Sequence, residues 1–463
     1  MEKHYPIFTT TLTPEQITPD IVSKYIKRHA LEIPYLEKLE RYYTGEHDIR
    51  NRQKEKGLSN NKLVTNHAKY IADFISGYLA GEPVSYTSET DADITALTDA
   101  LKKAKAYIQD TDLALDASKF GRAYEYIYTS NEPGTVYAKL ARFSPLNAFV
   151  VYDDTVEQNP VFGVYYYPVY DADGNMTGYN GLYCTALYIY NFVLTRDKSV
   201  QSVAEPQEHP FGKVPLDEIY NDFERIGDYE DVISLIDAYN ILQSDRVNDK
   251  EQFVNALLVI RGQVLGDTDE EAAETMDAIQ QHGVMTLDRD ADAAYLTRSM
   301  DESGSEILKT SIVHDIHKIS CVPDMSDENF AGNVSGVAMR FKLLALEQRT
   351  KIKERFFTEG LQYRLECIAN LLKVQGSGAI NTDDIKITFT RSLPANEVEE
   401  AQVTSMLQGI VSDKTLLSRL SFVTSPEEEA KAVETDKQAA LDRQQQVQQA
   451  LMRSEYGAGL GNV

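Results

Sequence analysis

Three side chains of types that bind metal ions, His314, His317 and Cys321, follow one another along one predicted helix. Their spacing of three and then four residues places them on one helix face, and imidazole and thiolate groups are zinc ligands. Three ligands in line along a helix rarely converge on one ion, and Cys321 lies beside Pro323, which breaks the helix. We therefore interpret this face as packed helix surface and expect no metal site.

A second candidate is the segment Asp171-Ala172-Asp173-Gly174-Asn175, whose alternating Asp and Asn side chains resemble a calcium-binding loop. The later glutamate and the spacing of such a loop are missing, so a hairpin turn is the favoured interpretation. The pair Gly212-Lys213 lacks the upstream glycine and the downstream hydroxyl of a phosphate-binding loop. No G-x-S-x-G motif marks a nucleophile. The sequence predicts no catalytic residue and no cofactor.

The most informative charges lie on a long predicted helix, which can run from about Gly336 to Lys373 without a proline. Its basic residues are Arg340, Lys342, Arg349, Lys351, Lys353, Arg355, Arg364 and Lys373, and its acidic residues are Glu347, Glu354, Glu359 and Glu366. Two interpretations remain open. The cations neutralise acidic neighbours within or between subunits, or they contact DNA phosphates. The candidates for phosphate or inter-subunit contacts are Arg340, Lys342, Arg349 and Lys351.

Length and composition set limits on the class of protein. The chain has 463 residues, 42% of them apolar, which is enough for more than one domain and a large core. It contains no apolar run of membrane-spanning length. Its three cysteines are far apart, which favours folding in a reducing cytosol. The net charge of −26 argues against simple coating of nucleic acid and indicates either solubility or a surface that stays near DNA without adhering to it.

Hydrophobic periodicity predicts the elements that would position these residues. Helical spacing dominates the N-terminal part, with helices over Ile21–Tyr43 and Ala68–Leu79 and two more within residues 91–121. From Ala123 the period changes to two. The predicted strands are Val136–Leu140, Ala148–Tyr152, Phe162–Tyr170 and Leu182–Phe192.

The second half of the chain is again mainly helical. A helix over residues 228–253 and a strand over 256–262 are followed by an excursion, residues 263–302, with a short acidic helix (269–281) and two short strands (284–287 and 293–296). About 40 residues cannot hold a core alone, so we expect this excursion to pair with neighbouring chains. A helix then opens at Ser303 with a capping box to Glu306. Beyond the long helix, a strand over Ile385–Phe389 and helices within 396–452 are expected.

Several motifs resemble, in the same order, those of portal proteins of tailed double-stranded-DNA bacteriophages, of the type found in siphophages of Gram-positive bacteria. They are Tyr42-Tyr43-x-Gly45-x-His47-x-Ile49, Asn60-Asn61-Lys62, Gly77-Tyr78-Leu79-x-Gly81-x-Pro83-Val84, Pro215-Leu216-x-Glu218 through Ile236-Asp237-Ala238-Tyr239-Asn240 to Ser244-Asp245, and Asn333-Val334-Ser335-Gly336-Val337-Ala338 with Arg340-Phe341-Lys342-Leu343-Leu344. No motif after residue 396 matches.

The resemblance implies an α+β class, a mainly helical portal fold with a β-rich wing, two stem helices, a small α/β clip and a helical C-terminal crown. The implied parts are the wing (1–227, β-rich over 123–195), the first stem helix and exit strand (228–262), the clip (263–302), the second stem helix (303–323), the tunnel loop (324–336), the long wing helix and return strand (337–395), and the crown with its tail (396–463).

The resemblance also implies a function without catalysis, a twelve-fold ring at one capsid vertex through which DNA is packaged and ejected. The implied partners are other copies of the chain, double-stranded DNA, terminase, a head–tail adaptor, and the major capsid and scaffolding proteins, with no membrane. The implied location is the virion, after synthesis in the bacterial cytoplasm. The alternatives are a phage or plasmid DNA-processing enzyme and a multi-helical scaffold protein that does not bind DNA.

In that family the tunnel loop surrounds DNA. The residues of this loop are Asp324, Met325, Ser326, Asp327, Glu328, Asn329, Phe330, Gly332 and Asn333. Its carboxylates would repel phosphate rather than hold it, which suits a surface along which DNA slides.

Overall fold

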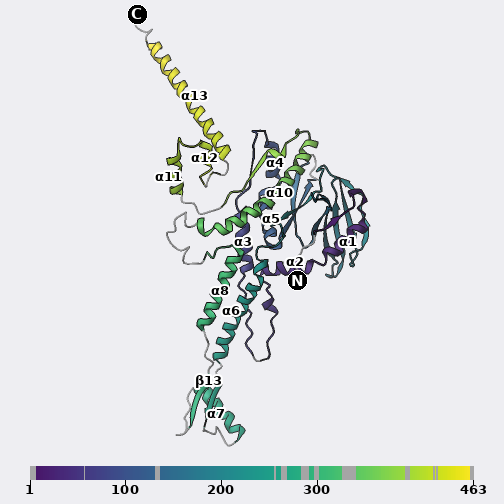
Figure 1. Cartoon of the computed structure of the whole chain (residues 1–463), viewed down its shortest axis with the longest axis vertical. Coiled ribbons are helices and arrows are strands. Elements are labelled where there is room, and N and C mark those ends of the chain that lie inside the picture. Colours follow the sequence, from purple (N-terminus) through teal and green to yellow (C-terminus); the bar gives the residue numbers. More distant parts are fainter. Residues whose placement is uncertain are drawn as a thin grey trace. The chain divides into compact units, whose positions relative to one another are not determined.

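The computed structural model describes residues 7–56, 58–130, 136–254, 257–261, 268–282, 291–296, 302–325, 340–391, 397–420, 423 and 426–458. These residues form an α+β chain (Figure 1). The chain divides into two compact units. The first unit comprises Met1–Glu40, Tyr70–Glu230 and Cys321–Val463, and the second comprises Arg41–Lys69 and Asp231–Ser320.

The largest sheet of the first unit has seven strands and is mostly antiparallel, as expected for alternating sequence. Its strands are β1 (Thr9–Thr10), β5 (Ala148–Asp153), β6 (Pro160–Tyr170), β7 (Met176–Cys184), β8 (Tyr188–Leu194), β9 (Val200–Val203) and β10 (Gln207–Glu208). The order is β1-β5-β6-β7-β8-β10, with β9 also paired to β8. Phe149, Val151, Phe162 and Val164 fill its core together with Ile26 of helix α1 (Pro19–His29).

The predicted hairpin turn at residues 171–175 is confirmed. It joins β6 to β7, and the Asp171 carboxylate accepts the backbone N–H groups of Asp173 and Asn175 at 3.0 and 2.8 Å. The predicted single strand Leu182–Phe192 is wrong. It is the end of β7, a turn after Thr185 and the start of β8, because the N–H of Thr185 bonds to the carbonyl of Tyr188 at 2.9 Å and reverses the chain.

A second sheet, with strand order β11-β3-β4, lies in the same unit. Its strands are β3 (Arg122–Thr129), β4 (Ala138–Phe143) and β11 (Leu216–Tyr220), and the short pair β2 (Ser85–Ser88) with β14 (Ile385–Thr388) forms a sheet of its own. Helices α4 (Thr95–Lys103), α5 (Ala106–Phe120) and α10 (Leu344–Val374) pack with these strands, and α3 spans His67–Ala80. The predicted helix over 68–79 and the two predicted within 91–121 are therefore confirmed.

Two predicted helices are interrupted. The helix predicted over Ile21–Tyr43 is α1 followed by α2 (Ile33–Thr44), with a turn at residues 30–32, because Pro34 has no N–H to offer to the preceding turn. The long helix predicted from Gly336 begins at Leu344. Residues 340–342 are helical, but Leu343, at φ −88° and ψ 0°, buries its side chain and breaks the continuity of the helix.

The second unit centres on two helices that run side by side, α6 (Ile233–Val254) and α8 (Glu302–Ser320) (Figure 1). Between them in sequence are β12 (Leu257–Arg261), α7 (Asp269–His282) and β13 (Asp292–Leu296), with β12 and β13 antiparallel. These elements confirm the predicted helices and the strands at 256–262 and 293–296. The strand predicted at 284–287 lies outside the described residues.

Short elements complete the chain. The 3₁₀ turns are η1 (Pro14–Gln16), η2 (Asp48–Asn51), η3 (Glu230–Val232) and η4 (Thr382–Asp384). The C-terminal part of the first unit is helical, as predicted, and consists of α11 (Glu397–Leu407), α12 (Asp413–Leu417) and α13 (Pro426–Ala458).

Candidate DNA-channel segment and its anchoring network

The structure describes only the start of the candidate loop. Asp324 and Met325 are described, and Met325 is 44% exposed. The other candidate residues lie outside the described residues, namely Ser326, Asp327, Glu328, Asn329, Phe330, Gly332 and Asn333. The role of these residues therefore stays a prediction.

Tyr70 of α3 holds the chain where this segment begins. Its hydroxyl donates to the carbonyl of Pro323 at 2.9 Å and lies 3.4 Å from the N–H of Met325. Burial raises the pKa of Tyr70, and the Asp324 carboxylate acts in the same direction, so this hydroxyl stays protonated. The neighbouring Val322 is buried. Tyr70 of α3 therefore fixes the position of the chain at the start of the candidate loop.

The candidate cations at the other end differ in their surroundings. Arg340 and Lys342 are exposed and precede the break at Leu343. Lys351 is exposed and lies 3.6 Å from Glu347, one turn earlier in the same helix. Arg349 is only 24% exposed, and its Nε lies 3.3 Å from the Asp228 carboxylate. The structure therefore places Arg349 in an ion pair within its own chain.

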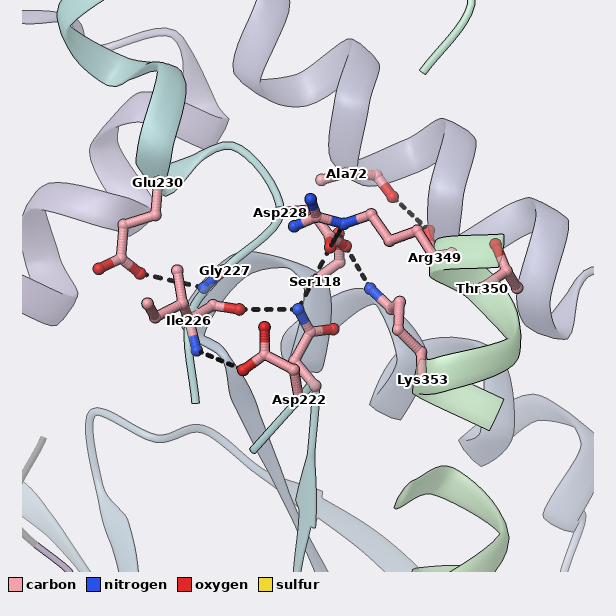
Figure 2. A network of polar contacts seen from close by, with 12 residues as sticks. Ala72, Ser118, Asp222, Ile226, Gly227, Asp228, Glu230, Arg349, Thr350 and Lys353 are labelled. Carbon is pink, nitrogen blue, oxygen red and sulfur yellow. Dashed lines mark hydrogen bonds and ion pairs between the residues drawn. The ribbon is translucent and has the colours of Figure 1, made fainter. Parts of the chain in front are cut away.

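Asp228 is the centre of a buried polar network (Figure 2). Its carboxylate accepts the hydroxyl of Ser118 at 2.6 Å, an amide N–H of Asn221 at 3.2 Å, and the ammonium of Lys353. Arg349 and Lys353 are four residues apart, so they lie on the same face of α10 and both reach one carboxylate. The network joins the end of α5, the segment before η3 and the first turns of α10.

The charges in this network support one another. Burial opposes ionisation of Asp228, but Lys353 and Arg349 outweigh it and hold the pKa of Asp228 below its usual value. Burial lowers the pKa of Lys353, while Asp228 favours its charged form. A buried ion pair contributes little net stability when intact. Removal of one partner lowers the stability of the fold strongly, because it leaves a buried charge without a partner.

The turn that carries Asp228 depends on Gly121. This glycine has φ +77°, and a Cβ built on it would lie 1.9 Å from the carbonyl oxygen of Arg225. Its own carbonyl accepts the N–H of Asn221 at 2.9 Å. Only glycine fits there, since both the left-handed backbone and the close approach exclude a side chain.

A second ion network anchors α10 further along. Arg364 is fully buried and donates to both carboxylate oxygens of Glu125 on β3, at 2.6 and 2.9 Å. Its Nη1 lies 2.7 Å from Asp110 of α5. Arg349, Lys353 and Arg364 therefore all neutralise carboxylates of their own chain, as one of the two interpretations of the basic helix expects.

Motif residues that are far apart in sequence meet in the second unit. Asn240, Ser244 and Asn248 lie at intervals of four on α6, and their side-chain oxygens accept backbone N–H groups of the extended segment 61–65. The three N···O distances are 2.7 to 2.9 Å. The Tyr42 ring stacks on His47 at 4.6 Å, and His47 lies 2.8 Å from the Asn240 amide. These motifs thus build the structure around α6.

His314 and His317, two of the three residues considered as zinc ligands, have different surroundings. His314 is largely exposed, and the His317 ring faces that of His67 at 6.0 Å. Among the described residues, no group of three or more His, Cys, Asp and Glu side chains is placed to hold an ion. Within the same residues, no helix combines the length and apolar character needed to cross a membrane.

Sequence reasoning did not find Asp228 as the partner of the basic helix. Asp228 is one of many acidic residues, and nothing local distinguishes it. The available signal was the spacing of Arg349 and Lys353, which predicts one shared anion on one helix face. The position of that anion, more than a hundred residues earlier, follows only from the fold.

Comparison with known proteins identifies the family. The sequence profile described as "Phage portal protein, SPP1 Gp6-like" matches residues 22–443. The portal protein of Bacillus phage SPP1 is 26% identical over 447 residues, 90% of this chain and 86% of that protein. The portal protein of Clostridium phage phiCD119 is 23% identical over 84% of this chain and 90% of its own.

Among solved structures, a chain in the neck of an empty gene transfer agent particle is similar to this chain, with 15% sequence identity and a TM-score of 0.44. The similarity extends over 75% of this chain and 88% of that chain. The family profile spans nearly the whole chain, including both ends of the candidate loop and the network around Asp228. The chain therefore belongs to the SPP1 Gp6-like family of phage portal proteins.

Proposed function

We propose that this chain is the subunit of a twelve-membered ring at one capsid vertex, through which double-stranded DNA enters the capsid during packaging and leaves it during ejection. Membership of the portal family supports this role. The chain is made in the bacterial host cytoplasm and ends in the virion.

The parts of the ring follow the order of the elements. The wing is 1–227 with 337–395, the stem is 228–262 with 303–323, and the clip is 263–302. Residues 324–336 are the tunnel loop and 396–463 the crown. The clip docks terminase and later the head–tail adaptor, while capsid and scaffolding proteins contact the outer parts.

One observation carries the proposal of a ring. Apolar side chains of the second unit stand open to solvent on the paired helices, with Ile307 at 72%, Leu308 at 51% and Ile319 at 46% on α8 and Ile241 at 45% on α6. Apolar residues gathered on one unit mark a surface that another chain covers. Since a ring subunit has a neighbour on each side, copies of the same helices are the proposed cover.

Negative-stain micrographs of the purified protein test the proposal. Closed rings with a central channel are the expected result. A chain that stays monomeric at all concentrations and never forms rings in the presence of capsid and scaffolding proteins would contradict it. Replacement of Ile307 and Leu308 by glutamate should reduce the ring fraction, whereas the same change at the exposed Leu31, which lies outside the second unit, should not.

The proposed role needs no catalysis. The network around Asp228 joins α5 to α10, and its buried carboxylate is neutralised by Lys353, which fits a structural role. The purified protein should show no ATP hydrolysis and no metal-dependent DNA cleavage. A steady-state turnover that disappears with a single point substitution would overturn this part of the proposal.

A further inference from the structure

A groove of about 520 Å³ in the first unit is lined by an unusual set of cations. It lies where β14 and the residues after it face α12 and the residues that follow α12. Its basic residues are Lys386, Arg391, Lys414 and Arg419. In a protein of net charge −26, such a collection needs an explanation.

The groove differs in the charge of its lining from the surface beside it. None of its described lining residues is an aspartate or a glutamate. An adjacent groove shares Lys386 and Lys414, but Glu89, Asp93 and Glu428 line it as well. Lys386 and Lys414 therefore separate two grooves, one lined by charges of both signs and the other lined by positive charge.

The cations have different roles. Arg391 lies 3.4 Å from the Glu347 carboxylate and also pairs with Glu354, so it is held from the α10 side. Lys386 and Arg419 are exposed. These two exposed side chains can turn toward an incoming anion without breaking an ion pair that the structure shows.

The remaining polar groups match a phosphodiester. Hydroxyl side chains, among them Thr388, Thr415 and Ser418, share the groove with the cations. Hydroxyl, lysine and arginine groups are the usual contacts of DNA phosphates, whereas base recognition needs groups that reach base edges or stack on them. Phe389 is the single aromatic residue among the described lining residues.

We propose that this basic groove binds the phosphate backbone of DNA without reading its sequence. The inference rests on the proposed function, because a portal ring brings DNA close to the wing and crown. The acidic surface elsewhere repels DNA over distances up to a Debye length, so the groove acts at short range and at specific residues.

The test is the binding of a fluorescent duplex of about 30 base pairs to the full-length protein between 50 and 200 mM salt, followed by anisotropy. The variant is Lys386→Gln with Arg419→Gln. The matched control is Lys24→Gln with Lys102→Gln, which removes the same net charge from exposed positions outside the groove. Circular dichroism checks that both variants fold.

The groove variant should bind roughly tenfold more weakly at 50 mM salt, and the slope of log K against log salt should fall by about 1.8, since each phosphate contact contributes about 0.9. The control should keep the wild-type slope. Equal losses in both variants, an unchanged slope, or absence of binding by the wild type would overturn the inference. Tighter binding of poly-glutamate than of DNA would assign the groove to an acidic protein segment and overturn it too.

Micrographs of the same preparations separate this inference from the proposed function. If rings form and DNA binding is the same in the groove variant and in the control, the groove is not the DNA-binding site, and the portal role stands. A protein that binds DNA through the groove but never forms rings would refute the portal role alone.

Discussion

Replacement of Asp228 by asparagine tests whether the network in Figure 2 anchors α10. The side chain keeps its size, but the charge that faces Lys353 and Arg349 is lost. Lys353 is 3% exposed, whereas Arg349 is 24% exposed and keeps part of its hydration. The unpaired ammonium of Lys353 should therefore account for most of the loss in folding stability.

Removal of one partner from a buried ion pair costs about 3–5 kcal/mol, and we expect Asp228→Asn to fall in that range. Lys353→Met should cost less, about 1–2 kcal/mol, because Asp228 would keep Arg349, Ser118 and Asn221 as partners. The double variant should cost about 2 kcal/mol less than the sum of the single variants, since neither charge is then left alone.

The measurement is urea unfolding of the full chain at fixed protein concentration, followed by far-UV circular dichroism because the chain has no tryptophan. With a slope of about 3 kcal/mol per M urea, the midpoint of the transition should fall by about 1 M. Hydrogen exchange of α10 assigns the loss to that helix. Lys351→Met, on the exposed side of the same helix, is the control and should change stability by less than about 0.5 kcal/mol.

The effect should also depend on pH. The pKa of Asp228 is lowered in the folded chain, so its ionised form contributes stability above the pKa of the unfolded chain, about 4, and this contribution disappears as the pH falls through the folded value. The difference between wild type and Asp228→Asn should therefore shrink below about pH 4. A loss under about 1 kcal/mol at neutral pH, or a double-variant coupling of zero, would refute the anchoring role.

Three further predictions concern assembly, passage of DNA and the backbone. Deletion of residues 264–300 with a Gly-Ser join should leave a soluble chain with a helical circular dichroism spectrum that forms few rings in micrographs; outright unfolding would place this module in the main core. Asp327→Lys with Glu328→Lys should leave ring formation intact but shorten the packaged DNA, because a cationic loop holds phosphate; lost rings or normal packaging would contradict that role. Gly121→Ala should lower the melting temperature by several degrees, since the new Cβ would lie 1.9 Å from the Arg225 carbonyl oxygen at φ +77°; an unchanged melting temperature would contradict the close approach.

Helices and strands with clear periodicity could be located from sequence. The helix over 68–79, the two within 91–121, and those around 228–253 and 303–319 all appear in the structure within a few residues. Local signals also sufficed for the turn at 171–175, where the Asp171 carboxylate accepts the backbone N–H groups of the residues two and four positions later. Where contacts lie within one turn of the chain, neighbouring residue types contain the needed information.

Other features depended on partners that are distant in sequence. Nothing in Phe341-Lys342-Leu343-Leu344 predicts a break, and Leu343 leaves the helix where its side chain becomes buried. The sequence by itself determined the family, the net-basic character of the long helix and the alternation that makes the sheet. Only the tertiary structure decided which of those cations are buried against Asp228 and Glu125 and which, such as Lys351, remain exposed. Burial and pairing depend on residues brought together from more than a hundred positions away.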